Sequence, residues 1–191
     1  MKSTRSRLER HTLTMNAAHI PAVDSGRIIK VNHAGEHGAV NIYAGQLAAA
    51  RWRARELLPE LAEFKAHEER HRSIFANELK RRGLPRCRSY WLCGLGGYVL
   101  GFFTGLMGIR FIATATVAVE RVVLQHLQQQ LLDVGMTDPD ASAAISAILS
   151  EEQYHHDQSA AHIRHTGAFD RMIGSVISAA TESVIWIGMR I

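Results

Sequence analysis

The sequence is poor in the residues that characterise β-proteins, secreted proteins and disulfide-rich folds. Its 191 residues include four prolines and two cysteines, and few Thr or Val residues fall at the alternating spacing of strands. Cys87 and Cys93 form neither a disulfide framework nor the Cys-x-x-Cys pair of a zinc or rubredoxin site. Residues 1–19 contain no apolar run of the kind found in secretory signals. These absences favour an all-α protein in a reducing compartment.

The chain is long enough for one substantial core and too short for two ordinary domains with a linker. Residues 1–23 carry four basic residues among their first ten positions and are predicted to form a flexible arm. Residues 24–191 are therefore predicted to form a single domain.

Capping residues and helix breakers divide this domain into about six helices. Asp24 or Ser25 suits the N-cap of a first helix that runs to about residue 55. Pro59 suits the first turn of a second helix, which ends before Gly83. A bend or break is expected near Gly108, and Gly135 suits the C-cap of the helix that follows. Asp138 and Pro139 form an N-cap and first-turn pair that opens one helix ending before Gly167. A last helix is expected over residues 168–190.

Four glutamates interrupt the apolar stripes of these predicted helices. Glu36 shares its stripe with Val40, Tyr43 and Leu47 at three- and four-residue steps, so it points towards the core. The other three glutamates occupy similar stripes, and two of them are followed three residues later by histidine. Buried carboxylates without partners cost on the order of several kcal/mol each, so four in one core require cations or protons.

The spacing of these residues predicts a pair of metal ions. Di-iron and di-manganese bundles use one Glu from each of two helices and a Glu-x-x-His from each of the other two. Two Glu-to-Glu intervals of 32 residues, offset from each other by 84 residues, indicate a helix pair used twice. Oxygen-rich ligation suits iron or manganese better than copper or zinc. The predicted metal-binding and catalytic residues are Glu36, Glu68, His71, Glu120, Glu152 and His155.

Residues 89–109 contain no charged side chain, and basic residues flank them on both sides. This length could span a bilayer, although glycines recur every four residues from Gly97 to Gly105, as in closely packed helices. We expect the segment to dock on anionic headgroups. A buried core helix and a full membrane span are the alternatives.

Residues 27–36, which read Arg-Ile-Ile-Lys-Val-Asn-His-Ala-Gly-Glu, resemble the opening signature of the demethoxyubiquinone hydroxylases. Residues 116–120 and 151–157 resemble the third and fourth ligand segments of that family, and the resemblance extends over about residues 26–191. Asn32, His37 and Arg121 stand where Asp, Tyr and Glu are common in the family. Arg121 is expected to place a positive charge beside the site.

The resemblance implies a ferritin-like four-helix bundle with two additional apolar or amphipathic helices. It implies a monooxygenase that hydroxylates the ring of a polyprenyl demethoxy-benzoquinol in ubiquinone biosynthesis. Two iron ions per chain, with manganese as the alternative, would use O₂ as co-substrate and NADH or the quinol as electron source. The expected location is peripheral, on the cytoplasmic face of a bacterial inner membrane or the matrix side of the mitochondrial one. The polyprenylated quinone and the membrane surface are the expected partners, a lipid-binding partner protein and a homo-oligomer stay open, and no nucleic acid is expected.

Two other functions use the same ligands. A ferritin-like ferroxidase or iron-storage protein needs no uncharged, glycine-rich segment, and a di-iron tRNA hydroxylase would exploit the net charge of +4. His33, His37, His67 and His126 lie near predicted ligands in the sequence. Ordinary polar placement is the favoured interpretation for these four histidines, and the alternative is that they support the ligands or relay protons.

Overall fold

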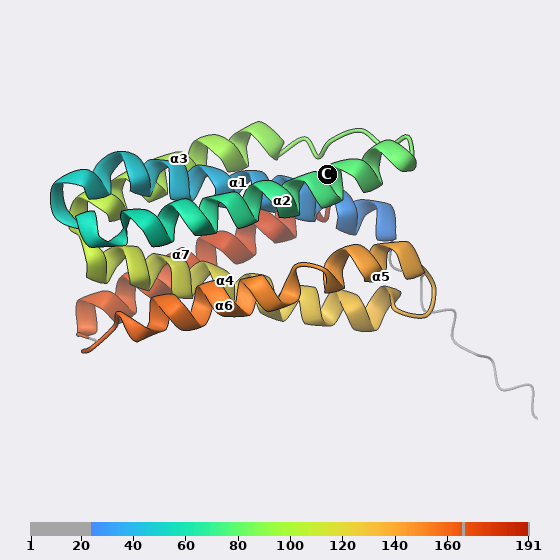
Figure 1. The fold of residues 1–191 in the computed structure, drawn as a ribbon. Helices are drawn as coiled ribbons and strands as arrows, with labels where there is room; N and C mark the ends of the chain where they lie inside the picture. The colour runs from blue at the N-terminus through green and yellow to red at the C-terminus, as the bar shows by residue number, and fades with distance from the viewer. Residues whose placement is uncertain (1–23, 166, 191) are drawn as a thin grey trace, which may run out of the picture.

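The computed structural model describes residues 24–165 and 167–190, and this part of the chain contains helices and no strand (Figure 1). The predicted arm of residues 1–23 lies outside the described residues. The α-helices are α1 Ser25–Arg53, α2 Leu58–Arg81, α3 Tyr90–Met107, α4 Ile109–Val134, α5 Pro139–Ser146, α6 Leu149–Ala161 and α7 Ala168–Gly188, with a 3-10 turn η1 at Arg55–Leu57.

A four-helix bundle forms the centre of the molecule. The hairpin of α1 and α2 supplies two of its helices, α4 supplies the third, and α5 and α6 in succession supply the fourth (Figure 1). The two additional helices lie outside this bundle, with α3 packed along α1 and α7 packed along α4. The prediction of an all-α bundle with two further helices is confirmed.

The predicted helix ends follow from local side-chain chemistry. The Asp24 carboxylate accepts a hydrogen bond from the Arg27 amide at 3.2 Å, and the Asp138 carboxylate accepts one from the Ala141 amide at 3.0 Å. Gly108 separates α3 from α4 with a φ of 94°, which an L-residue rarely adopts. Gly135 ends α4 as predicted, but with an ordinary right-handed φ of −53°.

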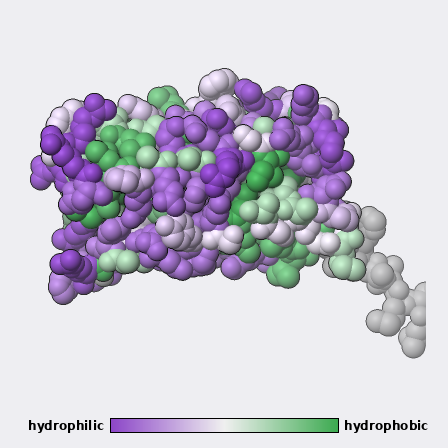
Figure 2. All heavy atoms as spheres, in the orientation of Figure 1, coloured by the Kyte–Doolittle hydropathy of each residue, from purple (hydrophilic) through white to green (hydrophobic). Residues whose placement is uncertain are grey.

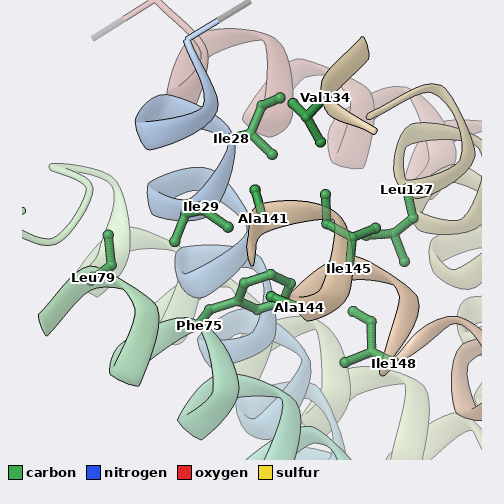
Figure 3. Close-up of a cluster of buried hydrophobic side chains, with 10 residues drawn as sticks. All are labelled: Ile28, Ile29, Phe75, Leu79, Leu127, Val134, Ala141, Ala144, Ile145 and Ile148. Atoms are coloured by element: carbon green, nitrogen blue, oxygen red, sulfur yellow. The ribbon is translucent and has the colours of Figure 1, made fainter. Parts of the chain in front are cut away.

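The prediction of one unbroken helix after Pro139 is wrong, because two residues, Ala147 and Ile148, separate the end of α5 from the start of α6. At this break the Ile148 amide donates to the Ile145 carbonyl at 3.3 Å, a three-residue step in place of the helical four. Both isoleucines are fully buried where α5 meets α1, α2 and α4 (Figure 3). The buried cluster there comprises Ile28, Ile29, Phe75, Leu79, Leu127, Val134, Ala141, Ala144, Ile145 and Ile148.

Helix α3 directs its glycines towards α1. A β-carbon at Gly101 would overlap the backbone carbonyl of Ile42, and one at Gly97 would overlap the carbonyl of Gly38. Since glycine has no β-carbon, the two backbones approach closely along most of α3. The opposite face of α3 exposes large apolar side chains to solvent: Trp91, Leu92, Leu95, Val99 and Phe103.

Of the described helices, α3 alone is long and apolar enough to cross a membrane, and this reflects only its length and composition. It is not a buried core helix, because only 28% of it is buried within the molecule. Helix α7 also exposes apolar residues, including Met172, Val176 and Trp186. The face over α2 and α6, seen in Figure 2, is by contrast mostly hydrophilic.

Candidate metal centre

Helices α1, α2, α4 and α6 each direct one glutamate into the middle of the bundle, and α2 and α6 each add a histidine. The apolar stripe of each helix faces the core, so a polar residue on that stripe becomes buried. The structure brings all six predicted ligand residues together, each at most 5% exposed: Glu36, Glu68, His71, Glu120, Glu152 and His155.

The six side chains form two overlapping groups of four. Glu36 and His71 belong to one group, Glu120 and His155 belong to the other, and all ligand atoms within a group lie within 4.8 Å of one another. The remaining two carboxylates, Glu68 and Glu152, belong to both groups. This arrangement suits two neighbouring metal ions with the shared carboxylates between them.

Several ligand atoms in the cluster lie close to one another but have no partner in hydrogen-bond geometry. They include both carboxylate oxygens of Glu68, Oε1 of Glu152, and Nδ1 of His71 and of His155. Buried polar atoms without partners are rare in folded proteins and destabilise them. The orphaned atoms and the oxygen-rich donor set fit a pair of divalent iron or manganese ions.

Burial shapes the protonation of the metal-free cluster. It raises the pKa of all four carboxyl groups, to about 8 for Glu36 and about 7 for Glu152. Burial also lowers the pKa of His155. For His71, burial lowers the pKa, but the carboxylates of Glu152, Glu36 and Glu68 outweigh burial and raise it. Protons therefore compensate the acidic cluster when cations do not.

The histidines hold their Nδ1 atoms towards the carboxylates. Nδ1 of His71 lies 2.9 Å from Oε1 of Glu152, and Nδ1 of His155 lies 3.1 Å from Oε1 of Glu68. On the opposite ring edges, Nε2 of His71 lies 2.7 Å from Oε2 of Glu151, and Nε2 of His155 lies 3.0 Å from Nδ1 of His67. Partners at the outer nitrogen orient an imidazole ligand and select its tautomer.

Neither of these two outer contacts was predicted, and a third contact, on Glu120, was not predicted either. Tyr43 is 1% exposed, and its hydroxyl donates a hydrogen bond to Oε1 of Glu120 at 3.0 Å. The sequence placed Tyr43 on the Glu36 stripe only as a core residue. Glu151 was noticed only through the family resemblance. A polar group on a ligand-bearing stripe is the signal that could have identified Tyr43.

An apolar cavity of about 540 Å³ adjoins the cluster. All four glutamates of the cluster line it, and the rest of its wall comes from α1, α3, α4 and α7. The helices α3 and α7 contribute mainly apolar or small residues, among them Leu92, Gly96, Leu100, Val176 and Val184. The exposed apolar faces of the two outer helices are thus continuous with a cavity that reaches the carboxylates.

Comparison with known families identifies the family of the chain. Residues 24–188 match the sequence model of a family described as "Ubiquinone biosynthesis protein COQ7". The chain belongs to the COQ7 family.

Individual relatives of this COQ7-family chain carry hydroxylase names. The "NADPH-dependent 3-demethoxyubiquinone 3-hydroxylase, mitochondrial" of Dictyostelium discoideum is 32% identical over 172 residues, which cover 86% of this chain and 76% of the relative. The "3-demethoxyubiquinol 3-hydroxylase" of Rhodospirillum rubrum is 32% identical over 173 residues, covering 90% and 80%. A mouse protein with the same name as the Dictyostelium one is 30% identical over 183 residues, covering 93% and 82%.

Arg121, which was expected to differ from other COQ7 proteins by placing a charge beside the site, points elsewhere. Its side chain is exposed and donates a hydrogen bond to Oγ of Ser178 on α7 at 3.0 Å. Adjacent residues on a helix do not share a face, so Arg121 cannot follow Glu120 into the cluster. The prediction of a positive charge at the site is wrong.

The other histidines divide into two kinds. His33 and His37 stack on Tyr90 of α3, with ring centroids 4.9 and 4.0 Å from it, and His126 contacts Glu182 of α7 at 2.8 Å. Among the described residues, none of these three touches a predicted ligand, but His33 is only 2% exposed and its Nδ1 has no hydrogen-bond partner, so its position is not an ordinary polar one. His67 differs from these three, because it touches the ring of the predicted ligand His155.

Proposed function

We propose that this COQ7-family chain is a di-iron monooxygenase that hydroxylates the ring of a polyprenyl demethoxy-benzoquinol in ubiquinone biosynthesis. The observation that carries the proposal is the apolar cavity lined on one side by the four buried glutamates. The cavity suits a lipid-like ring, and the carboxylate and histidine cluster suits two metal ions. The names of the relatives support the same substrate class.

Each residue of the cluster has a role in this proposal. Glu68 and Glu152 would contribute to both metal positions, Glu36 and His71 would complete one of them, and Glu120 and His155 would complete the other. When bound, two ferrous ions supply the activation of O₂, one atom of which enters the ring while the other leaves as water. The apolar walls exclude water from the reacting ring.

The surrounding residues position the ligands. Tyr43 holds Oε1 of Glu120, and Glu151 and His67 hold the outer edges of the two imidazoles. The reaction also consumes two electrons and two protons. The mitochondrial relatives are named for NADPH, so the electron donor we propose is a reduced nicotinamide, with the quinol as the alternative.

The exposed faces of α3 and α7 support peripheral attachment to a membrane that contains the quinol. Arg86 and Arg88 precede α3, and Arg110 follows it, where they can meet anionic headgroups. Because the glycine face of α3 is packed on α1, α3 could cross a bilayer only by carrying the charged helix α1 with it. We therefore place the chain on the surface of the inner membrane of a bacterium or a mitochondrion.

The alternative functions fit the cavity less well. A ferroxidase must admit hydrated ferrous ions, which an apolar passage disfavours because it offers few polar atoms to replace their water. A tRNA hydroxylase requires arginine or lysine residues along the approach to its site. Here the walls contributed by α3 and α7 carry no basic side chain.

The proposal is tested by supplying the reduced, iron-loaded chain with a demethoxy-quinol and ¹⁸O₂. We expect a ring-hydroxylated product that contains one labelled oxygen. Glu36→Ala and His155→Ala should abolish turnover, whereas Glu69→Gln, which changes a partly exposed side chain of α2 that pairs with Lys65, should not. A di-iron-loaded, membrane-bound preparation that consumes O₂ without hydroxylating the quinol, and that mineralises ferrous iron, would identify a ferroxidase instead.

A further inference from the structure

A pair of amide side chains interrupts the apolar wall of the cavity. Nδ2 of Asn32 on α1 donates to Oε1 of Gln130 on α4 at 2.8 Å, and Nε2 of Gln130 donates to Oδ1 of Asn32 at 3.1 Å. Gln130 is 6% exposed, and both residues line the cavity. The two bonds hold both amides in one orientation across the gap between α1 and α4.

The amide pair has unused hydrogen-bond donors and acceptors, whereas other polar residues of the wall already use theirs. A carboxamide offers two N–H donors and two carbonyl lone pairs, and the reciprocal bonds use one of each on Asn32 and on Gln130. Thr181 donates its hydroxyl to the Ile177 carbonyl at 2.9 Å, and His126 faces Glu182 at 2.8 Å. Apart from the cluster itself and the weakly hydrogen-bonding thiol of Cys93, Asn32 and Gln130 are the polar side chains of this cavity with both a donor and an acceptor to spare among the described residues.

The pair lies one helical turn from the metal cluster. Asn32 precedes Glu36 by four residues on α1, so the two side chains point from the same face and are separated by roughly 6 Å along the helix axis. A benzoquinol ring is about as wide as this separation. A ring that presents one edge to the carboxylates therefore brings an oxygen on its other side within reach of the amides.

We propose that the Asn32–Gln130 amide pair binds one ring oxygen of the substrate and so decides which ring carbon faces the metal cluster. This inference rests on the proposed function, since it takes the quinol as the occupant of the cavity. A quinol hydroxyl both donates and accepts, and a quinone carbonyl accepts. The amide pair offers both partners, so it can hold the ring in either redox state.

The test measures how the metal-loaded full chain binds two probes under anaerobic conditions, where no turnover occurs. One probe is a short-tailed isoprenyl 1,4-benzoquinol, and the other carries the same tail on a benzene ring without oxygens. Equilibrium dialysis gives the ratio of the two dissociation constants. A merely structural role of the amides would change both constants together, whereas a role in ring recognition changes their ratio.

The decisive variant is N32L/Q130M, which replaces both amides by apolar side chains of similar size. We expect its preference for the quinol over the oxygen-free probe to fall about 10-fold, which corresponds to about one good hydrogen bond. It should bind the oxygen-free probe as the parent chain does. Thr181→Val is the matched control, because Thr181 lines the same cavity with its hydroxyl already bonded. It should leave the ratio unchanged.

The outcomes separate this inference from the function on which it rests. If the parent chain binds the quinol and N32L/Q130M keeps the full preference for it, the amide pair has no part in recognition and the inference fails alone. If the metal-loaded parent chain binds neither probe, the cavity is not a quinol site and both proposals fail. Should the double variant not fold by circular dichroism, Gln130→Met decides, and an unchanged ratio in that variant overturns the inference.

Discussion

Oε2 of Glu151 lies 2.7 Å from Nε2 of His71, on the ring edge that faces away from the cluster, and Oε1 of Glu151 accepts a hydrogen bond from the exposed Arg70 at 2.8 Å. This chain of contacts runs from the surface to a buried ligand. The carboxylate of Glu151 accepts a hydrogen bond from a proton-bearing Nε2, so it favours the tautomer of His71 in which Nδ1 is free to bind a metal ion.

We therefore expect Glu151→Gln to weaken metal binding by about 10- to 100-fold without removing a ligand. Competition with a chromophoric chelator measures the effect. Glu69→Gln is the matched control, since Glu69 lies on α2 and pairs with Lys65 at the surface. Equal affinities in the two variants would show that Glu151 does not support His71.

The sharing of ligands predicts different metal stoichiometries for different glutamates. Glu120→Ala leaves the group of Glu36, His71, Glu68 and Glu152 complete, so we expect about one metal ion per chain and no coupled pair. Glu68→Ala damages both groups and should reduce binding to less than one ion. Elemental analysis and the magnetic coupling of bound manganese report the two results. Zinc alone in the parent chain, or two ions in Glu120→Ala, would contradict the assignment.

The pH dependence of stability follows from the buried carboxyl groups. Burial raises the pKa of Glu36 from 4.5 to about 8, so the folded metal-free chain holds a proton that the unfolded chain releases. This contribution to stability is complete below pH 4.5 and is lost as the pH rises towards 8. Glu152, with a pKa of about 7, acts in the same direction.

We expect the unfolding free energy of the metal-free chain to fall between pH 6.5 and 8, by about 1.4 kcal/mol per pH unit for each group that keeps its proton. The range starts at 6.5 because His33, whose pKa burial lowers to about 4, destabilises the fold only below that pH. Glu36→Gln should make the fall smaller, because one of the groups that keep a proton is then absent. The metal-loaded chain should not show this fall, because metal binding improves as the ligands lose protons. Urea unfolding at several pH values tests all three statements.

Much of the site could be predicted because its signals are local. The three-residue Glu-to-His spacing and the apolar stripes assign six inward-facing residues without knowledge of the tertiary fold. Asp24 and Asp138 likewise mark helix starts by chemistry within one turn. The 84-residue offset extends the same reasoning to the pairing of two hairpins.

The features that were missed depend on contacts between distant segments. The break between α5 and α6 falls at Ala147 and Ile148, which are neither glycine nor proline, and it accompanies the burial of Ile145 and Ile148 in one cluster with residues of α1, α2 and α4. The contact of Glu151 with His71 joins residues 80 positions apart. The wrong prediction for Arg121 has another cause. Helix geometry alone excludes Arg121 from the face of Glu120, so its direction could have been predicted from the sequence.

The contact between α3 and α1 predicts opposite effects for two glycines of one helix. Gly101→Ala would place a β-carbon against the Ile42 backbone, so we expect destabilisation of about 1 to 3 kcal/mol. A β-carbon at the exposed Gly96 meets no atom within 4 Å, and alanine favours helix by up to about 1 kcal/mol. Gly96→Ala should therefore be neutral or stabilising in thermal unfolding. Similar losses in both variants would argue against close packing of α3 on α1.

Membrane attachment predicts that α3 and α7 control flotation with liposomes. The parent chain should float with vesicles that contain anionic lipid, and the bound fraction should fall with salt, because Arg86, Arg88 and Arg110 flank the apolar helix. Leu95→Glu and Phe103→Glu change side chains of α3 that are 66% and 60% exposed. Each should reduce the partition coefficient by about 10-fold or more, since burying such a side chain is worth roughly 1.5 to 3 kcal/mol.

Leu132→Glu is the control for these two variants, because Leu132 is 79% exposed but lies on α4, outside the two outer helices. It adds the same charge to the chain, so a general electrostatic effect would lower its flotation equally, whereas a docking surface on α3 would not. Parent protein that stays in solution with anionic vesicles at low salt would exclude docking. Protein that resists extraction by alkaline carbonate would instead favour a spanning segment, which the packing of α3 on the charged helix α1 argues against.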